Sequence, residues 1–181
     1  MPRIPPISGK ADVAPEYHDV VDAVLAVFGN VRGPFSMLLH SPKLAERMVG
    51  LVPFFREDSI VETRLRLPAI LAMVREREAD YVWAAQVRFA RQHGVREEII
   101  DLLRAKGDTA GLPENERLVV EFARSLARTN KVDQATFDAL KDRFGAQWMV
   151  ELTAAAVFYG ALCGIAATFE VPTLPDGDRF R

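Results

Sequence analysis

The chain has 181 residues, of which 49% are hydrophobic and 27% are charged, so it can bury one sizeable core and is expected to form a single domain. Its formal net charge of -2 at pH 7 leaves no positive field for phosphates, which argues against a nucleic-acid partner. The single cysteine, Cys163, excludes an intrachain disulfide and a cysteine-rich metal site, and it favours a cytoplasmic location.

The first 15 residues, MPRIPPISGKADVAP, contain prolines and no continuous apolar stretch. We therefore interpret them as an N-terminal arm rather than a signal peptide. Such an arm is expected to become ordered by packing on the body of the protein or on a second subunit. Residues 16–181 are predicted to form the folded domain.

Hydrophobic periodicity predicts the first helix over residues 16–28, where Val20, Val24 and Phe28 recur at i, i+4 and i+8. The segment 30–34 breaks this pattern. Ser41 followed by a proline is typical of a helix start and predicts a second helix ending near residue 55.

Ser59 and Glu62 have the spacing of a capping box, which predicts a third helix over residues 60–77 with a kink at Pro68. The remaining predicted helices cover residues 80–93, 96–106, a segment opening at 113, 134–144 and 147–169. Strand-like alternation and hairpin dipeptides are missing from the sequence, so we predict an all-α fold without a sheet.

The apolar run 152–169 approaches the length of a membrane span. Glu151 and Glu170 flank it and no basic cluster adjoins it, so we favour a core helix over a membrane helix. Ala156, Gly160 and Gly164 follow one another at four-residue spacing and are predicted to form a close-packing seam.

Three stretches taken together resemble the carboxymuconolactone decarboxylase-like and alkylhydroperoxidase D-like (AhpD-like) family. They are FSMLLHSPKLAERM at 35–48, RLRLPAIL with ADYVWAAQVRFARQHGVREEIIDLL at 64–71 and 79–103, and LPENERLVVEFARSLARTNKVDQATFDALKDRFGAQWMVELT at 112–153. The resemblance implies a single-domain helical bundle of the AhpD-like type with about 7–9 helices. It also implies a homo-oligomer, whether dimer, trimer or hexamer.

The family's redox-active members carry a glutamate, a Cys-x-x-Cys pair and a histidine at fixed spacing. The resemblance places Leu67 at the glutamate, Ala79 and Val82 at the cysteines, and Gln86 at the histidine. Peroxide reduction by such a pair needs an activated thiolate and a resolving thiol, so peroxidase activity is disfavoured here. Cys163 stands among alanines and glycines and is expected to be a structural thiol.

Gln86 shares one face of its predicted helix with Ala79 and Val82, and the polar stripe of Arg88, Arg91 and Gln92 lies roughly opposite. Gln86 is therefore predicted to point inward, either as a hydrogen-bonded core residue or as a polar anchor in a ligand pocket. A further set of aromatic residues could line that pocket or simply fill the core: Tyr81, Trp83 and Tyr159.

The resemblance implies, as the leading hypothesis, a decarboxylase acting on a small cyclic or aromatic-derived carboxylic acid, because that activity needs no cysteine pair. Arg66 or Arg75 would hold the substrate carboxylate. Gln86 or Tyr81 would donate to the developing oxyanion, and His40 would return the proton.

Two alternatives stay open from the sequence. One is a peroxiredoxin-like relative that has lost its redox chemistry. The other is a non-catalytic protein that binds a small molecule or serves in assembly. Three histidines without paired spacing do not indicate a metal site, so neither a metal nor a cofactor is expected.

Overall fold

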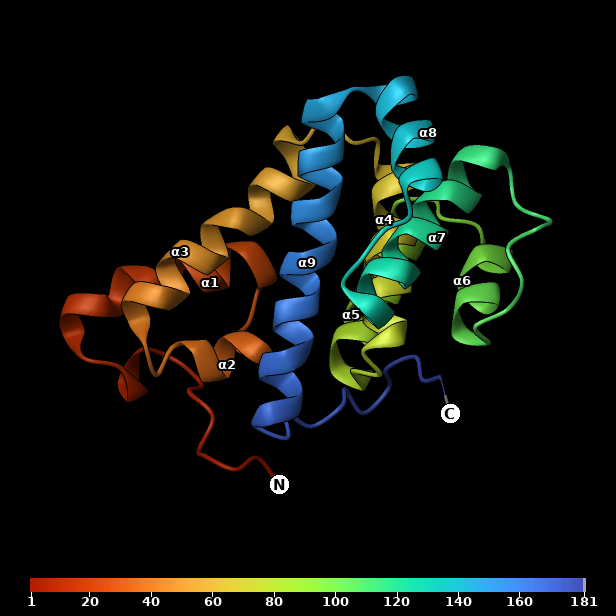
Figure 1. The fold of residues 1–181 in the computed structure, drawn as a ribbon. Helices are drawn as coiled ribbons and strands as arrows, with labels where there is room; N and C mark the ends of the chain where they lie inside the picture. The colour runs from red at the N-terminus through yellow and green to blue at the C-terminus, as the bar shows by residue number, and fades with distance from the viewer. Residues whose placement is uncertain (181) are drawn as a thin grey trace. The chain divides into compact units, whose positions relative to one another are not determined.

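The computed structural model describes residues 1–180. Within them the chain forms nine α-helices and no strand, which confirms the predicted all-α class (Figure 1). The α-helices are α1 (His18–Phe28), α2 (Pro34–Leu38), α3 (Pro42–Pro53), α4 (Thr63–Glu76), α5 (Asp80–Gln92), α6 (Glu97–Arg104), α7 (Glu114–Thr129), α8 (Gln134–Phe144) and α9 (Ala146–Thr168).

The helices divide into two compact units, and the single domain expected from chain length stays a prediction. The first unit comprises residues 1–59 and 165–172, and the second comprises residues 60–164 and the C-terminal segment from residue 173. Helix α9 runs from the second unit into the first.

In the first unit, α1 packs against α3 through a buried valine stripe and ends at Gly29, whose positive φ of 71° closes the helix. The N-terminal arm is tied to this unit. The Ile7 backbone N–H donates to the Ser36 carbonyl at 3.0 Å, and Arg3 pairs with Glu170 at 2.9 Å. The arm is thus ordered by packing within the chain itself.

The second unit is built around α4, which is buried at every position from Leu65 to Val74 and packs against α5, α6 and α7. Pro68 lies inside this helix. Met73 of α4, Ala127 of α7 and Ala156 of α9 form a buried cluster, so α9 belongs to the same core. These contacts fix the position of α5, on which the candidate site lies.

One expectation about a helix start is wrong, and one short helix was not predicted. Ser59 and Glu62 do not form a capping box, because α4 begins only at Thr63 and Glu62 instead accepts a hydrogen bond from the Trp148 indole at 3.0 Å. The segment after the break at 30–34 forms the short α2, whose five residues are too few to show a helical period in the sequence.

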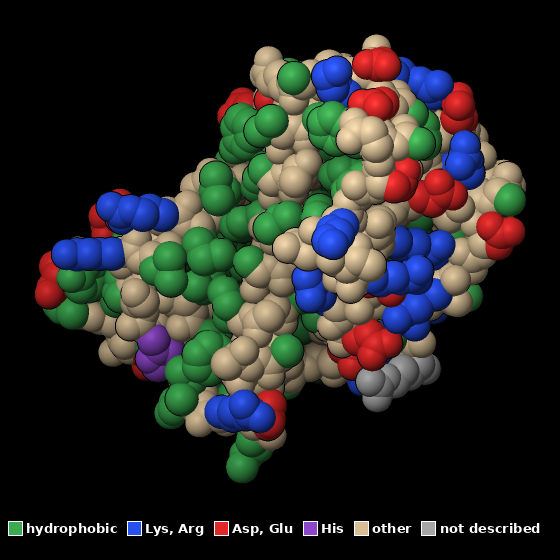
Figure 2. All heavy atoms as spheres, viewed as in Figure 1, with side chains coloured by type: hydrophobic (Ala, Val, Ile, Leu, Met, Phe, Trp, Pro, Cys, Tyr) green, Lys and Arg blue, Asp and Glu red, His purple; other side chains and the backbone are tan. Residues whose placement is uncertain are grey.

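Helix α9 is long and apolar enough to cross a membrane, yet half of its most apolar stretch is buried within the protein. On its surface side, Val150, Ala154 and Val157 line a pocket of about 470 Å³ together with Phe137 and Lys141 of α8. Figure 2 shows hydrophobic side chains gathered over this part of α8 and α9.

Of the two glycines in the predicted close-packing seam on α9, only Gly160 makes a close contact. A Cβ added to Gly160 would lie 3.3 Å from the Met73 sulfur, whereas nothing lies within 4 Å of a Cβ at Gly164. The same substitution therefore has different consequences at the two glycines.

We predict that Gly160→Val lowers the free energy of unfolding by about 1–3 kcal/mol, because the added methyl groups overpack the contact with Met73. Gly164→Val, on the same helix, should change it by less than about 1 kcal/mol. Urea unfolding followed by circular dichroism measures both. Equal losses of stability would show that Gly160 does not mark a close approach of α9 to α4.

Candidate ligand site on helix α5

The face of helix α5 that points into the protein is the one predicted from the sequence. Val82 and Gln86 are 3% and 6% exposed, and Ala79, which precedes the helix as its N-cap, is also buried. Arg88 and Arg91 are exposed on the opposite side. The inward orientation of Gln86 is thereby confirmed.

The Gln86 side-chain oxygen is buried and has no hydrogen-bond partner among residues 1–180. A buried acceptor without a partner costs roughly 1–3 kcal/mol, because the oxygen loses its bonds to water and gains none from protein. Gln86 is therefore not the satisfied core glutamine that was one of the two interpretations. Its oxygen offers a hydrogen-bond acceptor on a helix whose other buried residues are uncharged.

Trp83, one turn before Gln86, is completely buried and meets the C-terminal segment. Its indole Nε1–H donates to Asp178 Oδ1 at 3.0 Å, and its ring packs edge-on against Phe180 with 6.0 Å between centroids. Gly177 fits tightly beside α5, since a Cβ on it would lie 2.7 Å from the Ala84 Cβ. The segment from residue 173 thus covers this part of α5.

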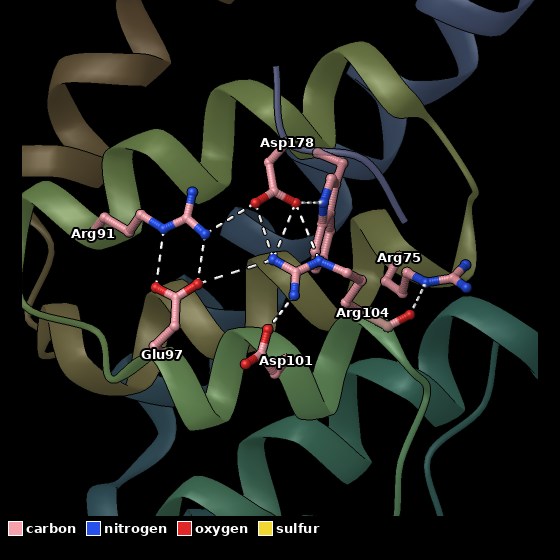
Figure 3. A network of polar contacts seen from close by, with 7 residues as sticks. Arg75, Arg91, Glu97, Asp101, Arg104 and Asp178 are labelled. Atoms are coloured by element: carbon pink, nitrogen blue, oxygen red, sulfur yellow. Dashed lines mark hydrogen bonds and ion pairs between the residues drawn. The ribbon is translucent and has the colours of Figure 1, made fainter. Parts of the chain in front are cut away.

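Asp178 is the centre of a polar network (Figure 3). Arg91 donates to its Oδ2 at 2.9 Å, and Arg104 donates to Oδ2 at 2.9 Å and to Oδ1 at 3.1 Å. Burial alone would raise the pKa of Asp178, but the hydrogen bonds from Arg104 and Trp83 outweigh it and hold the pKa below its ordinary value. Asp178 is therefore a carboxylate at neutral pH.

Arg75 belongs to the same neighbourhood. Its Nε donates to the Arg104 carbonyl at 2.7 Å, and its guanidinium lies 4.4 Å from the centroid of the Phe180 ring. Of the residues predicted to bind substrate, Arg75 and Trp83 are thus brought together by the C-terminal segment.

Arg66 and Tyr159 form a separate group. Both are buried, and Tyr159 and Glu151 act electrostatically on the Arg66 guanidinium, whose pKa is lowered mainly by its burial. Arg66 donates to the Val61 carbonyl and to the Thr63 hydroxyl. Its guanidinium is thus engaged within the protein.

The last two predicted catalytic residues lie apart from these groups. Tyr81, in the first turn of α5, is half-buried. His40 belongs to the first unit, where it is exposed and its Nε2 lies 2.8 Å from the Pro5 carbonyl oxygen. His40 thereby helps to hold the N-terminal arm, and its role in proton transfer stays a prediction.

Within residues 1–180, the side chains offer neither a readily ionised thiol nor a cluster of metal ligands. Burial raises the pKa of the Cys163 thiol to about 12, so it stays protonated at neutral pH. No group of three or more His, Cys, Asp or Glu residues suited to a metal ion occurs within 1–180.

The sequence did not reveal Arg91, Arg104 and Asp178 as partners. Arg91 was placed on the solvated face, and it is 87 residues from Asp178 along the chain. No local spacing connects residues so far apart. An Asp in a Pro- and Gly-containing tail was the only available signal, and it is a weak one.

The helical architecture of the chain is similar to that of several solved structures. No protein-family profile and no curated protein matches the sequence. An uncharacterized peroxidase-related protein from Ralstonia eutropha, with an alkylhydroperoxidase AhpD core, has a TM-score of 0.75 at 18% identity over 96% of this chain and 95% of its own.

Two further solved structures have the same helical fold as this chain. A cysteine-to-alanine variant of the debrominase Bmp8, in complex with 2,3,4-tribromopyrrole, has a TM-score of 0.74 at 18% identity over 97% of this chain and 95% of its own. A protein of unknown function from Agrobacterium tumefaciens, provisionally described as the antioxidant defence protein AhpD, has a TM-score of 0.68 at 16% identity over 80% of this chain and 100% of its own. The chain therefore has an all-helical fold of the AhpD-like type.

We predict that Cys163 in the native protein reacts with a disulfide reagent such as 5,5′-dithiobis(2-nitrobenzoate) at pH 8 at least about a thousandfold more slowly than in the unfolded chain. Its pKa is raised from 9.0 to about 12, and each unit reduces the thiolate fraction about tenfold. The absorbance of the released thiol measures both rates, with the urea-unfolded protein as control. Comparable rates in the two states would mean that Cys163 is an accessible, ionised thiol.

Proposed function

We propose that the chain is a non-redox protein of the AhpD-like fold that binds a small, mostly apolar molecule at α5. The observation that supports this function best is the buried, unpartnered oxygen of Gln86. A ligand that donates an N–H or O–H to this oxygen would remove its desolvation cost, so binding is favoured at this position.

The thiol chemistry of redox-active relatives has no counterpart here. The resemblance places Ala79 and Val82 at the positions of their cysteines, and both residues are buried and chemically inert. The remaining thiol, Cys163, is buried and protonated. Binding, rather than peroxide reduction, is the activity that these side chains support.

The ligand class follows from the donor requirement. The other buried residues of α5 carry no charge, so the Gln86 oxygen favours a phenol, an azole or an un-ionised carboxylic acid over a charged molecule. The tribromopyrrole of the Bmp8 variant, an apolar ring bearing one N–H, is a ligand of this kind on the same fold.

The decarboxylase hypothesis has less support. It needs a cation for the substrate carboxylate, and the guanidinium groups of Arg66 and Arg75 already donate to backbone carbonyls within the protein. Decarboxylation of a small carboxylic acid, assembly as a homo-oligomer and a cytoplasmic location stay predictions from the sequence.

We predict that Gln86→Leu raises the free energy of unfolding of the ligand-free protein by about 1 kcal/mol, because it removes a buried acceptor that has no partner. In thermal-shift titrations, phenol and pyrrole should stabilise the wild type and lose this effect in Gln86→Leu. Anisole, which resembles phenol but has no O–H donor, should stabilise neither protein.

Gln92→Leu is the matched control, because Gln92 lies on the same helix and is exposed. It should leave both the stability and the response to phenol unchanged. A phenol effect that persists in Gln86→Leu, or the same response to anisole as to phenol, would contradict a binding site at Gln86.

A further inference from the structure

The carboxylate of Asp178 is bound by a set of donors that do not belong to its own segment. Trp83 and Arg91 are on α5, Arg104 is at the end of α6, and all three direct N–H groups to the two carboxylate oxygens. The Arg104 guanidinium contacts both oxygens, which is the two-point recognition that arginine provides for a planar carboxylate.

These donors are positioned independently of the C-terminal segment. Glu97 accepts two hydrogen bonds from Arg91, and Asp101 accepts one from Arg104, so both guanidinium groups are oriented by residues of α6 (Figure 3). Trp83 is held by its position in α5, which packs against α4. The binding geometry would therefore persist if Asp178 withdrew.

Withdrawal of Asp178 would leave the site in need of an anion. Arg91 and Arg104 would then keep Glu97 and Asp101 as acidic partners, and each guanidinium would lose the ion pair that it makes with Asp178. The Trp83 indole N–H would also lose its acceptor. Both changes favour an external carboxylate over water.

The segment supplies an aromatic ring as well as a carboxylate. Phe180, two residues after Asp178, packs its ring edge-on against Trp83 and lies 4.4 Å below the Arg75 guanidinium. Asp178 and Phe180 together therefore present the chemistry of a small aryl carboxylate to α5 and α6.

We propose that Trp83, Arg91 and Arg104 form a binding site for a small aryl carboxylate, and that Asp178 and Phe180 occupy this site as an intramolecular competitor. The inference goes beyond the proposed function and depends on none of the contacts of Gln86. An aryl carboxylate binds when the segment leaves, so the apparent affinity is reduced by the fraction of molecules in which the site is filled.

The experiment follows the two tryptophan indole N–H signals in ¹H–¹⁵N NMR spectra of the full chain, which contains only Trp83 and Trp148. The signal lost in Trp83→Phe identifies Trp83. Phenylacetate is titrated into the wild type, into Asp178→Asn, and into Asp176→Asn, which changes an exposed carboxylate on the same segment. Acetate and phenylacetamide serve as ligands that lack the ring or the charge.

We expect Asp178→Asn to bind phenylacetate at least about tenfold more tightly than the wild type, with a shift of the Trp83 signal, because one charge-assisted contact of the competitor is lost. Asp176→Asn should behave as the wild type. Acetate and phenylacetamide should bind at least about tenfold more weakly than phenylacetate to Asp178→Asn. Adding Arg104→Gln to Asp178→Asn should abolish the gain.

Phe180→Ala provides a second test should Asp178→Asn prove unstable. It removes only the ring of the competitor and should also tighten phenylacetate binding. Equal affinity of the wild type and both variants for phenylacetate, or the same gain in Asp176→Asn, would overturn the proposal. Retention of phenol binding in Asp178→Asn would show that the Gln86 site is intact whichever result is obtained.

Discussion

The burial of α4 along its whole length is the constraint on which the second unit depends. Ten consecutive residues, from Leu65 to Val74, are shielded from solvent, so this helix has no free face and must be surrounded. Helices α5, α6 and α7 pack against it, and Met73 brings in α9. The two helices that hold the candidate sites, α5 and α6, are thus positioned by one buried helix rather than by their own polar residues.

Regular helices could be predicted from the sequence because the spacing of their apolar residues repeats over a few neighbouring positions. The orientation of α5 followed from the contrast between Val82 and Gln86 on one side and Arg88 on the other, and the buried face is the one expected. Prediction failed where a distant residue decides the local structure. Glu62 was assigned to a helix cap, but the Trp148 indole, 86 residues away, is its partner.

The same limit applies to the candidate sites. Arg66 and Arg75 were predicted to be available for a substrate carboxylate, and both are used to satisfy backbone carbonyls. Arg91, interpreted as a solvated residue, is 44% exposed and still binds Asp178. Neither exposure nor helical phase distinguishes such residues, because the carboxylate that selects them lies in a tail far along the chain. Only the inward direction of Gln86 was accessible to sequence reasoning.

Two polar groups on the buried side of α5 lead to the same requirement. The Trp83 indole N–H and the Gln86 oxygen each need a hydrogen-bond partner from outside their own helix. The first has one, because the C-terminal segment brings Asp178 to it, whereas the second has none among residues 1–180. Helix α5 thus has one buried polar group that depends on a carboxylate from a distant segment, and a second buried polar group that has no partner. Such a helix is better suited to admit polar ligands than to stabilise the fold. The proposed binding face on α5 is thus compatible with Ala79 and Val82 on the same buried side.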